Sequence, residues 1–144
     1  MSRAVLGLLA AVAALASSCD EARLPPATSK LLDPQGHFTL LVSNQSFAIS
    51  PVDIRVEIDD GTVVYERFEV GNQHRWKAFK LSLPLGKHTL RVSSAKGEAE
   101  LSREFEVKGE QWAIIDYWYY PKSHYNPTPK HFGFELLDHA PKFE

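Results

Sequence analysis

Cysteine is almost absent from this chain, because Cys19 is the only one. Without a second cysteine no disulfide can form within the chain, so stability has to come from apolar burial in a fold large enough to supply it. The position of Cys19 near the amino end also leaves the body of the chain without the thiolate that a blue-copper centre requires. No cofactor is predicted.

A surplus of positive charge is also lacking. The 16 Lys and Arg residues face 18 Asp and Glu residues, which gives a formal net charge of −2 at pH 7. A nucleic-acid binder needs a basic stripe to displace counterions from phosphates, so no nucleic-acid partner is predicted. No catalytic constellation stands out either, and we do not expect an enzyme.

No apolar run is long enough to cross a membrane as a helix. The longest, Ala4 to Ala16, has thirteen residues, too few to span ~30 Å of hydrocarbon. Arg3 precedes this run, and the small residues Ala16, Ser17 and Ser18 follow it. A basic start, a short apolar stretch and a small-residue end are the layout of a secretory signal peptide, which we predict over residues 1–18.

The segment Leu15-Ala16-Ser17-Ser18-Cys19 resembles the lipobox of bacterial lipoproteins, although Ala16 stands where leucine is commonest. The resemblance implies that Cys19 is lipidated, becomes the first mature residue and anchors the protein to a membrane of the cell envelope. The alternative is an ordinary signal peptide that leaves Cys19 as a free thiol, exposed to pairing with other molecules. The choice between inner and outer membrane is left open.

Residues 19–36 show no sustained hydrophobic period and contain Pro25-Pro26, so we predict that they form a tether. From His37 to residue 144 apolar residues recur at every second position, which is the period of a half-buried strand. Turn signals separate the runs, among them Asp60-Gly61, and Glu66-Arg67 interrupts one run in the manner of a bulge. The expected strands are Phe38–Val42, Ile54–Ile58, Val63–Val70, Phe79–Leu83, Leu90–Val92, Ala99–Val107, Gln111–Tyr120 and Phe132–Leu136.

Seven or eight short strands in one domain predict an all-β fold, a single antiparallel β-sandwich of the immunoglobulin or fibronectin type. The segment 84–92, Pro-Leu-Gly-Lys-His-Thr-Leu-Arg-Val, resembles a turn common in bacterial immunoglobulin-like and carboxypeptidase-regulatory-like sandwiches. This resemblance implies the architecture alone, because fold does not assign function.

The expected strand Gln111–Tyr120 is aromatic on both faces. Trp112, Ile114, Asp116, Trp118 and Tyr120 share one face, and Ala113, Ile115, Tyr117 and Tyr119 share the other. Only one face can line the core. We therefore expect either that residues 121–144 fold back as cover, with Tyr125, Phe132 and Phe134 among them, or that Trp118, Tyr120 and Tyr125 form an exposed platform for a sugar or a peptide.

Three further features of this region are candidates for function. Asp116 sits between aromatic neighbours and needs a polar partner, since an isolated buried carboxylate is costly. The loops Asn44–Pro51 and Gly71–Trp76 combine amides with an aromatic residue, a composition typical of sugar-binding loops and equally of loops that bond their own backbone. His124 and His131 flank a proline-rich loop and are candidate copper or zinc ligands, although no metal site is predicted.

Together these patterns predict a lipid-anchored, extracytoplasmic lipoprotein that acts as a non-catalytic binding module for a protein or glycan of the cell envelope. The candidate binding residues are Trp76, Asp116, Trp118, Tyr120 and Tyr125. The alternatives are a carbohydrate-binding module and a histidine-based copper or zinc carrier.

Overall fold

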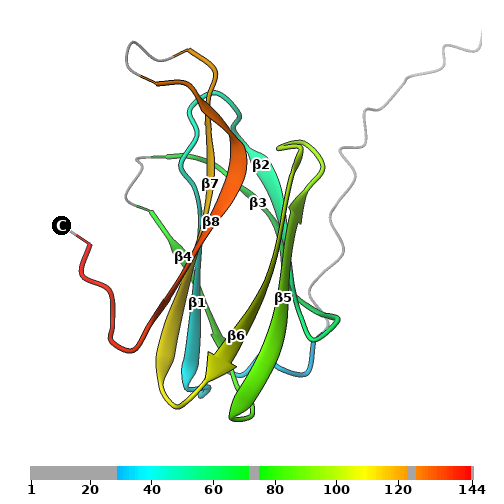
Figure 1. The fold of residues 1–144 in the computed structure, drawn as a ribbon, viewed down its shortest axis with the longest axis vertical. Helices are drawn as coiled ribbons and strands as arrows, with labels where there is room; N and C mark the ends of the chain where they lie inside the picture. Colours follow the sequence, from blue (N-terminus) through cyan, green and yellow to red (C-terminus); the bar gives the residue numbers. More distant parts are fainter. Residues whose placement is uncertain (1–28, 72–74, 123–125, 144) are drawn as a thin grey trace, which may run out of the picture.

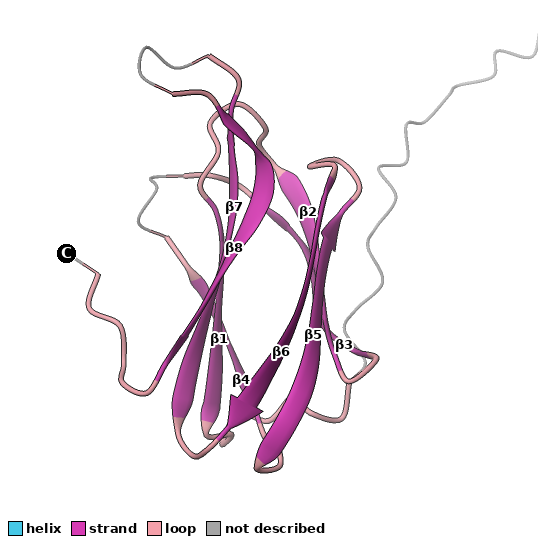
Figure 2. Cartoon of the chain, viewed as in Figure 1, coloured by secondary structure: helices cyan, strands magenta, loops and turns pink. Residues whose placement is uncertain are grey.

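The computed structural model describes residues 29–71, 75–122 and 126–143, and these form an all-β sandwich (Figures 1 and 2). Eight strands pack as two four-stranded sheets, in the order β4-β1-β7-β8 for the first and β3-β2-β5-β6 for the second. The strands are β1 (Phe38–Asn44), β2 (Val52–Ile58), β3 (Gly61–Phe68), β4 (Lys77–Leu81), β5 (Gly86–Ser94), β6 (Ala99–Val107), β7 (Gln111–Tyr120) and β8 (Thr128–Leu137). The predicted fold class is confirmed.

One pair departs from the antiparallel pattern. β1 and β7 run parallel in the middle of the first sheet, with Phe38 beside Gln111 and Asn44 beside Tyr117. A parallel pair needs a long crossover connection, and here the chain supplies it by passing through β2 to β6 before it returns. This pairing brings together residues more than seventy positions apart in the sequence.

The core lies between the two sheets and is built by the alternating residues of each strand. Phe38, Leu40 and Val42 of β1 face Val52, Ile54, Val56 and Ile58 of β2, and all of them are inaccessible to solvent. Tyr117 is the largest fully buried side chain, and its hydroxyl donates to the carbonyl oxygen of Gly97 at 2.8 Å. Burial raises the pKa of Tyr117 to about 12, so the phenol stays protonated and keeps this bond.

Residues 29–36, which fall within the predicted tether, pack on the sandwich. The amide of Asp33 donates to the carbonyl of Lys80, and that of Ser82 donates to the carbonyl of Leu31. Gly36 lies so close to β4 that a Cβ atom there would meet the carbonyl oxygen of Leu81 at 2.1 Å. Among the described residues, contacts with the sandwich thus include Ser29 and other residues that precede His37.

The hairpin between β2 and β3 turns one residue earlier than predicted. Asp59 and Asp60 form the two-residue turn, with φ of 48° and 64°, and Gly61 is already the first residue of β3. Both turn residues adopt the left-handed conformation that this type of hairpin turn requires. Gly61 is needed for a different reason, because a Cβ atom there would lie 2.9 Å from Ser29 Oγ.

The bulge predicted at Glu66-Arg67 is also displaced. Both residues pair regularly with β2, whereas the register shifts between Val56 and Glu57, whose partners are Val64 and Thr62. Val63 is therefore the extra residue of β3. Because the bulge changes the direction of its side chain, Val63 and its neighbour Val64 are both buried.

The two ends of the sandwich are distinct. Ser29 donates its backbone amide to Thr62 beside the β2–β3 turn, and we call this end the proximal end. The distal end, at the top of Figure 1, carries the β1–β2, β3–β4, β5–β6 and β7–β8 connections. Ion pairs join the edges of the two sheets, Lys77 of β4 to Glu66 of β3 on one side and Lys130 of β8 to Glu98 on the other.

A buried histidine ties two proximal turns together. His88 Nδ1 lies 2.5 Å from Asp59 Oδ2, and Nε2 lies 2.6 Å from the carbonyl oxygen of Pro84. Since both partners accept hydrogen bonds, the doubly protonated ring satisfies them best. Burial disfavours this charged form, but the bonds to Asp59 and Pro84 outweigh it and raise the pKa of His88 above its ordinary value.

The free energy of unfolding is expected to depend on this group. Protonated His88 stabilises the fold, so its contribution is fully present below about pH 6.5 and is lost as the pH rises through the folded-state pKa. Urea unfolding of the wild type between pH 6 and 9 should show falling stability, and the His88→Gln variant should lack this slope. Equal slopes in the two proteins would contradict the assignment, and His139→Gln, at an exposed histidine, is the matched control.

Candidate functional site

The outer face of the first sheet carries most of the predicted binding residues. Ala113, Ile115 and Tyr117 of β7 are buried in the core, whereas Asp116, Trp118 and Tyr120 are half-buried on the opposite face. Register pairs each outward residue of β7 with an outward residue of a neighbouring strand. The outer face of β7 therefore joins side chains from β1 and β8.

Asp116 lies at the centre of this face. Its carboxylate accepts hydrogen bonds from two side chains, as expected for an acidic residue between aromatic neighbours. Ser43 Oγ of β1 donates to Asp116 Oδ1 at 2.5 Å, and Trp76 Nε1 donates to the same oxygen at 2.8 Å. Two of the predicted residues, Trp76 and Asp116, are thus in direct contact. Among the described residues, no hydrogen bond ends on Asp116 Oδ2.

The ionisation of Asp116 is disfavoured. Burial raises the pKa of its carboxyl group, and the bonds from Ser43 and Trp76 reduce that rise without cancelling it. Glu135, on the outer face of β8 and diagonally across from Asp116, adds like-charge repulsion in the same direction. A carboxyl group whose folded-state pKa is raised lowers stability at pH values above that pKa.

A buried polar network extends from Asp116 into the β1–β2 loop. Ser43, Asn44, Gln45 and Ser46 are almost inaccessible to solvent. Gln45 Nε2 donates to Ser43 Oγ, and Asn44 Nδ2 donates to the carbonyls of Ile49 and Phe68. The composition of the loop Asn44–Pro51 was typical both of sugar-binding loops and of loops that bond their own backbone. The side chain of Asn44 follows the second pattern, because it bonds the carbonyl of Ile49 in the same loop.

The same loop is fastened to β7. The Gln45 amide donates to the Tyr117 carbonyl at 2.9 Å, and Ser46 Oγ donates to the Tyr119 carbonyl at 2.7 Å. The Tyr120 hydroxyl donates to the Gln45 carbonyl at 2.6 Å. Buried polar groups that are all bonded rigidify the segment that carries them. The β1–β2 loop is therefore braced, which here means that hydrogen bonds hold it to β7 and, through Asn44, to the end of β3.

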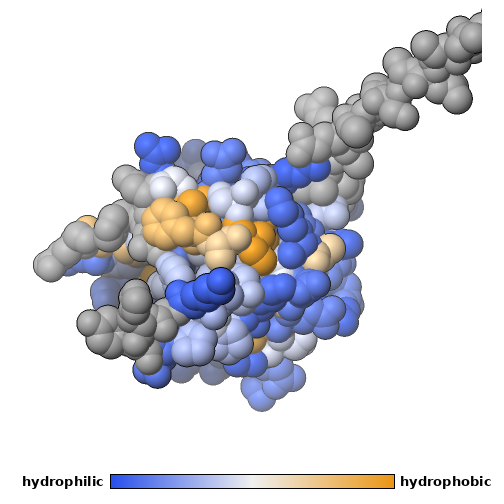
Figure 3. All heavy atoms as spheres, turned by 90° about the horizontal axis from the view of Figure 1, so that it is seen from above, coloured by the Kyte–Doolittle hydropathy of each residue, from blue (hydrophilic) through white to orange (hydrophobic). Residues whose placement is uncertain are grey.

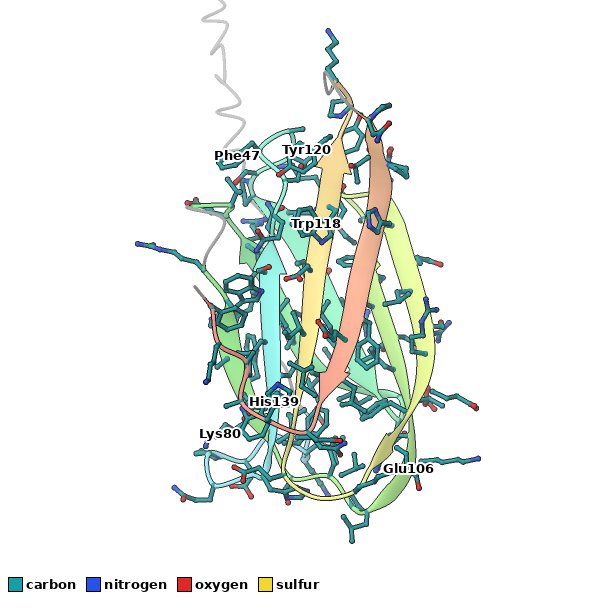
Figure 4. All side chains as sticks on the ribbon, turned by 60° about the vertical axis from the view of Figure 1, so that its left-hand side comes forward. Phe47, Lys80, Glu106, Trp118, Tyr120 and His139 are labelled. Carbon is teal, nitrogen blue, oxygen red and sulfur yellow. The ribbon has the colours of Figure 1, made fainter. Side chains whose placement is uncertain are left out.

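An exposed phenylalanine projects from this braced loop. Phe47 is 60% exposed, and its neighbour Ala48 is also exposed. Figure 4 shows Phe47 close to Tyr120 at the distal end, with Trp118 below them, and Figure 3 shows apolar side chains gathered on this end. The Trp118 and Tyr120 rings are 6.3 Å apart. We call Phe47, Trp118 and Tyr120 the distal aromatic patch. Phe47 is the aromatic residue of the candidate loop Asn44–Pro51, but it was not among the predicted binding residues, because strand alternation does not show which loop residues are exposed.

Trp118 lies beside a glycine of the adjacent strand. A Cβ atom at Gly133 of β8 would lie 3.8 Å from Trp118 Nε1, an ordinary contact distance. Such cross-strand contacts between an aromatic ring and a glycine stabilise edge strands. One side of the ring is thereby supported, and the residue as a whole stays half-buried.

Cover of the outer face comes from within the expected residues 121–144, but not from the phenylalanines named in the prediction. Phe132 and Phe134 belong to β8, which pairs beside β7, so both pack on the core side instead of over the outer face. Residues 138–143 instead run across the outer face toward Trp76, where Phe143 stacks at 3.9 Å between ring centroids and an interplanar angle of 11°. Tyr125 lies outside the described residues.

A groove of about 450 Å³ lies next to Trp76. Its lining is both polar and apolar, and its basic side chains come from β3, from the segment before β4 and from β4 itself. Its lining residues are Val42, Ser43, Asn44, Arg67, Phe68, Glu69, Arg75, Trp76 and Lys77.

Of the two candidate metal ligands, only His131 lies among the described residues. His131 is exposed, and its Nδ1 lies 2.7 Å from the carbonyl of Pro129, while His124 lies outside the described residues. Within residues 29–71, 75–122 and 126–143, no three His, Cys, Asp or Glu side chains form a group able to hold a metal ion. In the same residues we find no apolar helix of membrane-spanning length.

Comparison with known proteins adds no assignment: the chain matches no protein-family model, and no curated protein or solved structure is significantly similar to it.

The role of Asp116 can be tested by substitution. Asp116→Ala leaves the buried Ser43 hydroxyl and the Trp76 N–H without their acceptor and should lower the free energy of unfolding by about 2–4 kcal/mol. Asp116→Asn keeps an oxygen for both donors and loses the disfavoured charge, so it should stay within about 1 kcal/mol of the wild type. Chemical denaturation at pH 7 measures both, with Glu104→Ala, at an exposed glutamate of β6 in the other sheet, as the control. Equal losses for Ala and Asn would show that the charge, and not the acceptor, is what matters.

Proposed function

We propose that this protein is an exported, lipid-anchored, non-catalytic binding module that presents the distal aromatic patch to a protein partner at the cell envelope. The proposal combines the signal and lipobox pattern of residues 1–19 with the exposure of Phe47 on a braced loop. The exposed, rigidly supported Phe47 is the observation that carries it.

The chemistry of the patch favours a protein. Phe47 offers no hydrogen-bonding group, and much of the polar backbone around it is bonded within the loop, including the Ser46 and Ile49 amides and the Gln45 and Ile49 carbonyls. Large aromatic side chains that enter a partner's pocket supply most of the binding energy at many protein interfaces. Because the loop is already ordered, little conformational entropy is lost on binding.

The position of the patch is consistent with an anchor at the other end. The described chain enters the sandwich at Ser29, beside the proximal β2–β3 turn, whereas Phe47 and Tyr120 lie at the distal end (Figures 1 and 4). A module tethered through its amino end would hold this patch away from the anchoring membrane.

A carbohydrate-binding module is the second candidate. It is favoured by the groove beside Trp76, whose lining includes the basic side chains of Arg67, Arg75 and Lys77, which are groups able to bond sugar hydroxyls. Its volume is within the range of small-molecule sites. In this case the ligand would contact Trp76 and the groove instead of Phe47.

The anchor is tested with Cys19→Ser. Because several acyl chains bind a bilayer far more strongly than one, the mature wild-type protein should partition into the detergent phase of a Triton X-114 extract. The Cys19→Ser variant, which has no thiol to acylate, should lose that partitioning. A wild-type protein recovered in the aqueous phase, or mass spectrometry that finds an unmodified Cys19, would contradict the proposal.

The binding surface is tested by site-specific photocrosslinking in the native cell. A photoreactive phenylalanine analogue replaces Phe47 in one variant and Leu85 in the other, since Leu85 is 71% exposed and precedes β5 at the proximal end. Position 47 should give a discrete protein adduct, which Trp118→Ala should weaken, and position 85 should give none. Thermal melting should differ little between the Phe47→Ala variant and the wild type, because the side chain is exposed.

The same experiment separates the second candidate. The absence of an adduct at position 47, together with tryptophan fluorescence that responds to envelope oligosaccharides and no longer does so in Trp76→Ala, would replace the protein partner with a glycan. Adducts of equal yield at positions 47 and 85 would contradict a specific surface at the distal end.

A further inference from the structure

The outer face of the first sheet is apolar where residues 138–143 cross it. Leu41 of β1 and Ile114 of β7 point away from the core, yet they are only 9% and 8% exposed. Trp112 and Leu137 extend this apolar region toward the proximal end. A sheet face of this composition is normally covered, and Figure 4 shows the chain after β8 passing in front of β1. We call residues 138–143 the strap.

The strap is held at its two ends. At its start, Gln111 Nε2 donates to Asp138 Oδ1 at 2.8 Å. At its end, Phe143 stacks on Trp76 and remains 45% exposed. Within the described residues, no hydrogen bond joins residues 139–143 to the sheet. A segment ordered by two contacts gains little over the conformational entropy that it loses, so it can be displaced.

The site beneath the strap does not depend on it. Trp76 Nε1 is bonded to Asp116, and Asp116 is held by Ser43, so the orientation of the indole is set from within the sheet. Removal of Phe143 would therefore expose the flat face of an aromatic ring that is already positioned. Such preorganisation favours binding of a replacement group.

We propose that this face is a docking site for an extended peptide that carries an aromatic side chain. The strap occupies the site within the same chain. A partner protein displaces the strap with a segment of the same kind. The occupant follows from the strap itself, an extended run with a proline, Pro141, and an aromatic residue two positions later that stacks on Trp76. The inference rests on the proposed function in taking the partner to be a protein, but it uses a surface distinct from the distal aromatic patch.

The test measures binding of a fluorescent peptide with the sequence of residues 138–144 by anisotropy. A variant that ends at Asp138 should bind the peptide. The full-length protein should bind it with an affinity at least about tenfold lower, because its own strap competes for the site. A peptide in which alanine replaces the phenylalanine should not bind. In the shortened variant, Trp76→Ala should abolish binding, whereas Tyr65→Ala, an aromatic control on β3 of the second sheet, should leave it unchanged.

A second variant keeps the test decisive if the shortened chain does not fold. Phe143→Ala in the full-length chain removes the stacking contact alone and should increase peptide binding over the wild type. The proposal is overturned if neither variant binds the peptide while circular dichroism shows a native fold. It is also overturned if Trp76→Ala has no effect, or if sedimentation shows that the full-length protein dimerises by exchanging straps. Each of these results leaves crosslinking at Phe47 unaffected, so failure here is distinguishable from failure of the proposed function.

Discussion

The parallel pairing of β1 with β7 is the constraint on which the rest of the structure depends. It places Ser43 beside Asp116, 73 residues later in the chain, and the Gln45 amide beneath the Tyr117 carbonyl. The same pairing lets Ser46 reach the Tyr119 carbonyl. Without it, Ser43 Oγ, the Gln45 amide and Ser46 Oγ would lose these acceptors, and an unpaired buried polar group carries a large desolvation cost. One strand pair thus holds both the Asp116 site and the distal loop.

Two surfaces with different physical character result from this support. At the distal end, Phe47 is exposed on a loop whose polar groups are bonded inward, so a side chain is presented without loss of order. On the sheet face, Trp76 is fixed by Asp116 and covered by Phe143. The first surface is open and rigid, whereas the second is rigid beneath a weakly held cover. Both are suited to binding in ways that need little reorganisation of the protein.

Much of the fold could be predicted from the sequence, because period-two alternation reports which residues of a strand face the core. It separated the two faces of β7 correctly, and the cost of burying a carboxylate indicated that Asp116 needs a partner. Other features depend on contacts between distant segments. The bulge lies at Val63 and the turn at Asp59-Asp60, since register is set by strand pairing as a whole. No local pattern could show that Ser43 is the partner of Asp116 or that residues 138–143 cross the outer face.

The central claim, that an exposed aromatic side chain stands on a loop braced by the β1–β7 pair, is tested most directly by native-state hydrogen exchange. The amides of Gln45 and Ser46 donate to the Tyr117 carbonyl and to Asn44 Oδ1 in a buried site. The account predicts that both exchange as slowly as the amides within β7, through global unfolding alone. Exchange as fast as that of the exposed Lys122 amide would show that the loop is not braced and would contradict the account.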